Sequence, residues 1–205
     1  MKEEFKKQKR PTFIESLKLL IQKTEQQQEV EIQDILKTLN VRGYAAILVI
    51  FSFPFCFPFT IPGFSAPFGL LLAFIGLRIA FGNQLWLPQW ILVKKVSSSR
   101  LNKLLLKICH LMEKFQKFFK PRLIFLIQYR FFMRLHGVLI FVLGILLALP
   151  LPVPLTNTMA AAPLVCLGIG ILEDDGFAII AGYLLALLCF AFFAGLFFFG
   201  KALFT

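Results

Sequence analysis

The sequence predicts an all-α membrane protein, made of two proline-broken helical hairpins, a C-terminal span and amphipathic cytoplasmic helices. Of its 205 residues, 58% are hydrophobic and only 16% are charged, and the mean hydropathy is +0.78. Soluble domains carry about 25% charged residues. Three segments without Asp, Glu, Lys or Arg are long enough to cross a bilayer, and prolines interrupt the first two. These values exclude a soluble enzyme and a disordered tail.

The basic residues give the chain a formal net charge of +11 and lie mainly in two blocks, residues 1–42 and 83–135. Loops that remain in the cytoplasm are enriched in Lys and Arg. We therefore expect both blocks, and the N-terminus, to be cytoplasmic. Nucleic-acid binding is the weaker interpretation, because anionic lipid headgroups next to apolar segments account for the same charge.

Residues 1–42 are predicted to form cytoplasmic amphipathic helices, with two helical pieces over residues 12–39. Thr12 and Glu15 have the spacing of a capping box, in which two side chains bond the free backbone donors of a helix start. Apolar residues then recur at helical spacing on both sides of a polar run at residues 24–29. Such helices lie on a membrane surface or on the protein's own cytoplasmic face.

Residues 43–82 form the first predicted hairpin, and residues 122–200 form the second together with a C-terminal span. The uncharged runs 43–77 and 135–172 are too long for one straight helix, and the run 176–200 fits a single span. Proline removes a backbone donor and clashes with the preceding turn. Each long run is therefore expected to hold two short helices around a non-helical break, either crossing the bilayer fully or returning as a re-entrant loop.

The two broken runs also match each other at a constant offset of 96 residues. The shared pattern is P-x3-P-x-T-x5-A-P, beginning at Pro54 and at Pro150, and Arg78 falls opposite Asp174. Apolar, proline-rich segments match easily by chance. Five identities without a gap favour an internal repeat over that alternative.

Residues 83–121 are expected to form a basic cytoplasmic linker that contains an interfacial helix. Basic side chains recur every three or four residues over residues 100–120, and Leu, Ile and Phe cover the other face. This pattern is typical of a helix lying in the plane of an anionic membrane surface. A helix that docks on a partner protein is the alternative.

Small polar residues inside the two breaks are the first candidate ligands. Backbone that is not helical survives at membrane depth only when it is buried or lines a watery cavity, and paired broken helices indicate a transporter's binding site. The alternative is that these side chains simply cap helix ends. The candidates for solute binding are Thr60, Ser65, Thr156, Asn157 and Thr158.

Charged residues within the apolar segments complete the predicted solute-binding set: Arg78, Glu173 and Asp174. A charge at bilayer depth costs about 2.5–3.5 kcal/mol on insertion scales and is usually paired or functional. Arg78 could instead extend its charge to the interface. The acids at residues 173–175 could form a solvated turn before Gly176, a salt-bridge latch to Arg78 or to Arg130 and Arg134, or a proton or cation site.

The sequence predicts no enzyme. It contains no nucleophile elbow, Cys/His dyad, zinc-protease motif or phosphate-binding loop. The four cysteines have no metal-binding spacing, so no metal, cofactor or disulfide framework is expected.

Several stretches resemble the family of ExoD-like proteins, which is named for exopolysaccharide synthesis. They are the approach Ile35–Tyr44, the break Ile61–Ser65, the exit from Arg78 to Pro88, the run Pro154–Thr158 and the turn Leu172–Gly176. Thr156 stands where the family has Gly. The resemblance implies a multi-pass inner-membrane protein of bacteria, linked to polysaccharide production and without an established reaction.

Two functions follow as expectations. The first is a small-solute transporter or permease whose unknown solute binds between the two broken hairpins. The second is a non-transporting accessory subunit of an envelope polysaccharide assembly or export complex, acting through its amphipathic helices. Anionic lipids are the expected membrane partners, a homo-oligomer is compatible with either function, and no nucleic-acid partner is expected.

Overall fold

The computed structural model describes residues 13–26, 29–57, 65–81, 95–98, 129–150 and 155–203, together with residues 102, 105, 106, 109, 110 and 127. The chain divides into two compact units. One comprises residues 1–39 and 88–118, and the other comprises residues 40–87 and 119–205.

The first unit contains helix α1 (Phe13–Gln26) and strands β1 (Glu29–Glu31) and β2 (Lys95–Ser97), which pair antiparallel. Helix α1 is amphipathic, because Leu17 and Leu20 are buried while Leu19 is half exposed. Two helices do begin within residues 12–39, and β1 separates them. The second, however, continues to Ser52, so the boundary predicted at residues 42 and 43 falls inside a continuous helix. Thr12 and most of the predicted helix at 100–120 lie outside the described residues.

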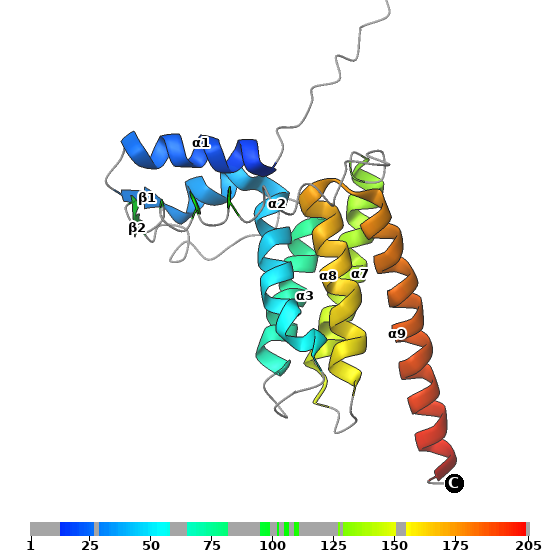
Figure 1. Ribbon diagram of the computed structural model, residues 1–205. Coiled ribbons are helices and arrows are strands. Elements are labelled where there is room, and N and C mark those ends of the chain that lie inside the picture. The colour runs from blue at the N-terminus through cyan, green and yellow to red at the C-terminus, as the bar shows by residue number, and fades with distance from the viewer. Residues whose placement is uncertain are drawn as a thin grey trace, which may run out of the picture. The chain divides into compact units, whose positions relative to one another are not determined.

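The second unit is a helical bundle (Figure 1). Its elements are α2 (Ile32–Ser52, of which the part from Asn40 belongs here), the 3-10 helix η1 (Phe53–Cys56), α3 (Ser65–Phe81), α7 (Arg130–Ala148), α8 (Thr156–Glu173) and α9 (Gly176–Leu203). Contacts between α2 and α3 run from Phe51–Phe68 at one end to Tyr44–Arg78 at the other, so these helices are antiparallel. Helices α7 and α8 repeat this arrangement.

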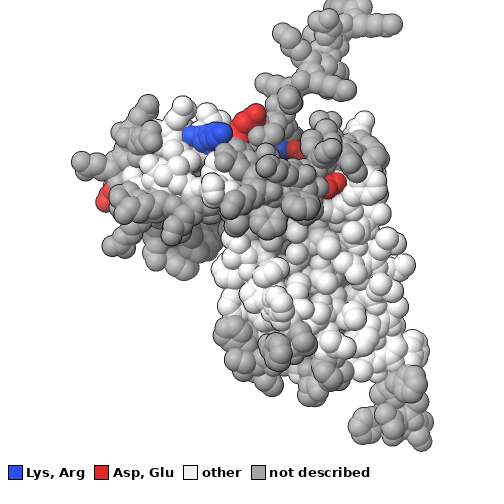
Figure 2. Space-filling view, viewed as in Figure 1, with Lys and Arg blue, Asp and Glu red and all other residues white. Residues whose placement is uncertain are grey.

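The bundle has the length and composition of a membrane-embedded structure. Helices α7, α8 and the segment Gly176–Phe198 of α9 are long and apolar enough to cross a bilayer, whereas the apolar helices Val41–Cys56 and Ser65–Phe81 are shorter. Large apolar side chains face outward, among them Leu70, Phe131 and Leu187. On the visible face of the bundle in Figure 2, the coloured acidic side chains lie near the upper end, and Lys201 belongs to the opposite end, in the last turns of α9. The predicted C-terminal span is therefore confirmed as a helix of suitable length.

Helices α3 and α7 pack at backbone distance through glycines. A Cβ atom built on Gly76 would lie 2.4 Å from the backbone nitrogen of Phe141, and one on Gly137 would lie 2.3 Å from that of Ala80. Gly69 and Gly144 make equally close approaches one to two turns away. Small residues permit such approaches between helices in membranes. We call the line of Gly69, Gly76, Gly137 and Gly144 the glycine seam.

The helix breaks are narrower than the proline pattern predicts. Helix resumes at Ser65 and at Thr156, so Pro67 lies in the first turn of α3 and Pro163 lies inside α8. Proline is tolerated in a first turn, because its missing N–H has no helical partner there. Pro163 costs one internal hydrogen bond but is buried among neighbouring helices.

The turn between α8 and α9 uses Asp174 rather than glycine as its left-handed residue. Asp174 has φ 55° and caps α8, with its backbone N–H bonded to the carbonyl of Gly170. The Asp175 carboxylate accepts a hydrogen bond of 3.0 Å from the N–H of Phe177 and so caps α9. The acids at 173–175 do form a turn before Gly176, but it is not the solvated turn expected, since Asp175 is buried and Glu173 and Asp174 are partly buried.

Candidate functional site

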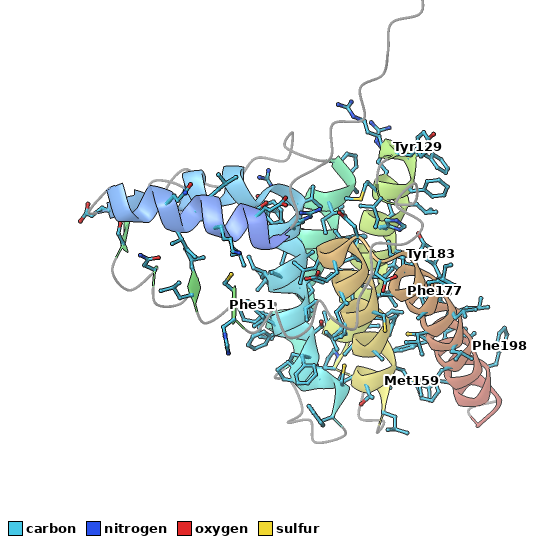
Figure 3. All side chains as sticks on the ribbon, turned by 45° about the horizontal axis from the view of Figure 1, so that its top comes forward. Phe51, Tyr129, Met159, Phe177, Tyr183 and Phe198 are labelled. Atoms are coloured by element: carbon cyan, nitrogen blue, oxygen red, sulfur yellow. The ribbon has the colours of Figure 1, made fainter. Side chains whose placement is uncertain are left out.

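The structure places the predicted site residues at opposite ends of the bundle. Ser65, Thr156, Asn157 and Thr158 lie at the starts of α3 and α8, whereas Arg78, Glu173 and Asp174 lie at the ends of the same helices. Met159 and Phe177 mark these two levels in Figure 3. An 18-residue helix is about 27 Å long. The two groups therefore do not form one site, and Thr60 lies outside the described residues.

At the charged end, Arg42 of α2 forms an ion pair with Asp174, and the pair joins the two hairpins. The side chains are only 11% and 19% exposed. The predicted salt-bridge latch therefore exists, but its cation is Arg42 and not Arg78, Arg130 or Arg134. Sequence reasoning missed Arg42 because it lies at the edge of the polar N-terminal segment, in the middle of the continuous helix α2.

Arg78 interacts instead with the aromatic side chain of Tyr44. Its Nη2 donates a 2.8 Å hydrogen bond to the Tyr44 hydroxyl, and its guanidinium carbon lies 5.3 Å from the centre of the Tyr44 ring. Cation–π contact of this kind stabilises an arginine that is partly removed from water. The Nε atom of Arg78 is buried without a hydrogen-bond partner among the described residues.

Glu173 immediately precedes Asp174, the acid of the ion pair with Arg42. Its Oε1 atom is buried and has no hydrogen-bond partner among the described residues. A buried polar atom left unpaired costs about 1–3 kcal/mol. The charged end therefore offers one unused donor, on Arg78, and one unused acceptor, on Glu173.

At the opposite end, the polar residues of the breaks begin helices. Ser65 and Thr156 are buried, and Asn157 and Thr158 are partly buried. Leu155, in the left-handed region with φ 71°, is the N-cap of α8, and it makes no side-chain capping bond. The Oγ1 atom of Thr158 has no hydrogen-bond partner among the described residues. The residue at the N-cap position of α8 is thus Leu155, not one of the polar residues predicted either to cap a helix or to bind a solute.

His136 and Tyr183 form a buried polar contact that sequence reasoning did not find. His136 on α7 is fully buried, and its Nδ1 lies 2.8 Å from the hydroxyl of Tyr183 on α9, which Figure 3 labels. The two rings meet edge to face with centres 5.6 Å apart. The contact joins α9 to the second hairpin. The sequence signal that could have revealed this contact is Tyr183, a tyrosine within the apolar run 176–200.

Replacing Tyr183 with Phe is expected to lower the free energy of unfolding by about 1–3 kcal/mol, because a buried imidazole loses a hydrogen-bond partner. The matched control is Tyr129→Phe, since Tyr129 is 64% exposed. Thermal unfolding of the purified protein in detergent measures the difference. Equal melting temperatures for the two variants would show that the His136–Tyr183 contact contributes no stability.

The apolar helices, three of them long enough to cross a bilayer, define a helical membrane protein. The sequence model of the family described as "Exopolysaccharide synthesis, ExoD" matches residues 13–195. The chain therefore belongs to this ExoD family. The expected family resemblance is thereby confirmed, as is the link that its name gives to exopolysaccharide synthesis.

Two curated relatives are similar along most of the chain. Protein ExoD of Rhizobium meliloti (strain 1021) is 30% identical over 155 residues, which cover 75% of this chain and 65% of that protein. The uncharacterized protein slr1875 of Synechocystis sp. (strain ATCC 27184 / PCC 6803 / Kazusa) is 27% identical over 175 residues, 81% of this chain and 82% of that protein. The match thus spans just under two thirds of the Rhizobium protein. No solved structure matches.

Proposed function

We propose that this ExoD-family protein is a small-solute transporter or permease of the bacterial inner membrane, and not an enzyme. The solute is held at the charged end of the bundle, where the two hairpins meet. The observation that carries this proposal is the Arg42–Asp174 ion pair, which connects α2 of one hairpin with α8 of the other inside an apolar bundle. Charges in such surroundings are costly and usually serve ions or substrates.

The internal repeat predicted from the sequence is consistent with the same proposal. At the offset of 96 residues, α2 corresponds to α7 and α3 corresponds to α8. Helix α3 packs on α7, and Gly168 of α8 packs on Leu48 and Val49 of α2. Under this correspondence, the contact between α3 and α7 is equivalent to the contact between α8 and α2. The two hairpins also run in the same direction (Figure 1). Repeated halves with a site at their interface are a common plan in transporters.

The repeat also favours one topology. Because both hairpins run in the same direction, the part of α2 that begins at Asn40 and the starts of α7 and α9 lie at one end of the bundle, with Arg42, Arg130 and Arg134 close to it. The enrichment of cytoplasmic loops in Lys and Arg assigns this end to the cytoplasm. The proposed solute site therefore lies near the cytoplasmic side of a multi-pass protein.

Transport by the full chain in proteoliposomes tests the proposal. The probes are radiolabelled glucuronate, phosphate and glucose, which present a carboxylate, a phosphate and no charge. We expect uptake of at least one probe above protein-free liposomes, and a fall of tenfold or more in Arg78→Ala, because its charge and hydrogen-bond donors lie at the charged end.

Asn157→Ala and Arg134→Gln serve as comparisons in the same assay. Asn157 lies at the opposite end of the bundle and tests whether the break residues also line the path. Arg134 is exposed, and its replacement removes an equal charge from the charged end. Protein-independent uptake of every probe, or full uptake by well-folded Arg78→Ala, would contradict the assignment. The accessory-subunit alternative rests on the N-terminal helices, of which α1 is described, and on residues 100–120, most of which lie outside the described residues.

A further inference from the structure

The bundle has more cations than acids to pair with them. Residues 40–87 and 119–205 contain seven Lys and Arg but only the three acids at 173–175. Asp174 pairs with Arg42, and Asp175 caps α9. Of the acids in this unit, only Glu173 remains without such a contact. Glu173 is therefore the one acid of this unit that could neutralise Arg78. Among the described residues, Glu173 and Arg78 form no ion pair.

Arg78 is nevertheless held in a defined position. The Tyr44 hydroxyl accepts a hydrogen bond from Nη2 at 2.8 Å, and the Tyr44 ring lies under the guanidinium. Tyr44 is only 9% exposed, so its ring is fixed by the bundle. One edge of the guanidinium, at Nε, keeps a buried donor without a partner among the described residues. Protein atoms cover that Nε edge, whereas the side chain as a whole is only partly buried. A guanidinium held in this way presents the paired N–H groups at its end, which suit a planar oxyanion.

We propose that Arg78 and Tyr44 form an oxyanion-binding site that takes a carboxylate or phosphate group. The N–H groups of Nη1 and Nη2, at the end of the Arg78 guanidinium, donate to two oxygens of the anion. The Tyr44 hydroxyl accepts from Nη2 and can donate its own proton to the anion. This inference rests on the proposed function, since it names the class of solute bound at the charged end.

A simpler role for Arg78 makes a different prediction. Arg78 lies in the last turn of α3, where any cation interacts favourably with the helix dipole. A lysine would serve that purpose equally well. It could not supply the two parallel donors of a guanidinium, so Arg78→Lys separates an oxyanion site from a dipole effect.

Ligand-induced thermal stabilisation tests the site on the full chain in nanodiscs. In pure phosphatidylcholine, inorganic phosphate and glucuronate are titrated, with glucose as the uncharged control. We expect a saturable rise in melting temperature with one or both anions and none with glucose. Arg134→Gln is expected to respond like wild type, Arg78→Lys with about tenfold weaker affinity, and Arg78→Gln not at all.

A second arm distinguishes a soluble anion from a lipid headgroup. If a lipid phosphate occupies the site, nanodiscs containing phosphatidylglycerol stabilise wild type but not Arg78→Gln, and soluble anions add nothing further. Tyr44→Phe keeps the ring but loses the hydroxyl, and it is expected to weaken either response.

The inference fails if Arg78→Lys or Arg78→Gln binds the anions as tightly as wild type, or if no anion and no anionic lipid stabilises wild type. Uptake of a neutral probe without anion binding would leave the transporter proposal standing and overturn this inference. Anion binding through Arg78 without any uptake would support this inference and contradict the transporter proposal.

Discussion

Gly137→Ala is expected to destabilise the protein by about 1–3 kcal/mol, and the double variant Gly76→Ala/Gly137→Ala by more. The added methyl group would lie 2.3 Å from the backbone nitrogen of Ala80. Backbone atoms cannot move aside as a flexible side chain can, so α3 and α7 must separate along the glycine seam. Thermal or denaturant unfolding of the purified protein in detergent measures the loss.

The control has the opposite expected sign. Gly195 lies in α9, and a methyl group added there would have nothing within 4 Å of it. Alanine favours a helix over glycine by about 1 kcal/mol, so Gly195→Ala should leave stability unchanged or raise it. If Gly137→Ala and Gly195→Ala shift the melting temperature alike, the backbone contact in the glycine seam is wrong.

Asp174→Asn is expected to cost about 1–3 kcal/mol of stability, because it leaves Arg42 facing an uncharged amide in a largely buried position. Asparagine suits the test since it keeps the shape of the side chain. It also tolerates the left-handed backbone at φ 55°, where alanine would add strain. The loss is therefore electrostatic and not conformational.

A double-mutant cycle isolates the ion pair from other effects. Arg42→Gln, Asp174→Asn and the double variant are compared with wild type by thermal unfolding in detergent. We expect the double variant to lose less than the sum of the single variants, with a coupling of about 1 kcal/mol or more. Additive losses would mean that Arg42 and Asp174 do not interact, and Arg134→Gln gives the baseline for removing an exposed charge.

The sequence predicted the helices of the bundle well, because uncharged runs and prolines report directly on burial and on helix continuity. It placed the C-terminal span, the two hairpins and the turn at residues 173–175 close to where they lie. It placed the ends of the breaks too far along the chain, since proline inside a first turn or among packed helices does not stop a helix.

The partners of the charged residues could not be predicted in the same way. The predicted latch pairs the acids at 173–175 with Arg78 or with Arg130 and Arg134. Arg78 and Asp174, which occupy matching positions in the two runs, form no ion pair with each other among the described residues. Both in fact contact α2, through Tyr44 and Arg42, two residues that lie two positions apart at the polar start of the first apolar run. Which helices lie side by side depends on close packing at glycines, and a single sequence does not reveal the partner of a given glycine.

The glycine seam limits how the two hairpins can move. Sliding α3 along α7 by one residue, about 1.5 Å, would bring a residue with a side chain against the opposing backbone. The seam therefore fixes the position of one hairpin relative to the other along the helix axes. The other inter-hairpin contact, between α2 and α8, is made by the side chains of Leu48 and Val49 and by an ion pair, which can adjust. Any rearrangement of this bundle should accordingly pivot about the glycines and open on the side of Arg42.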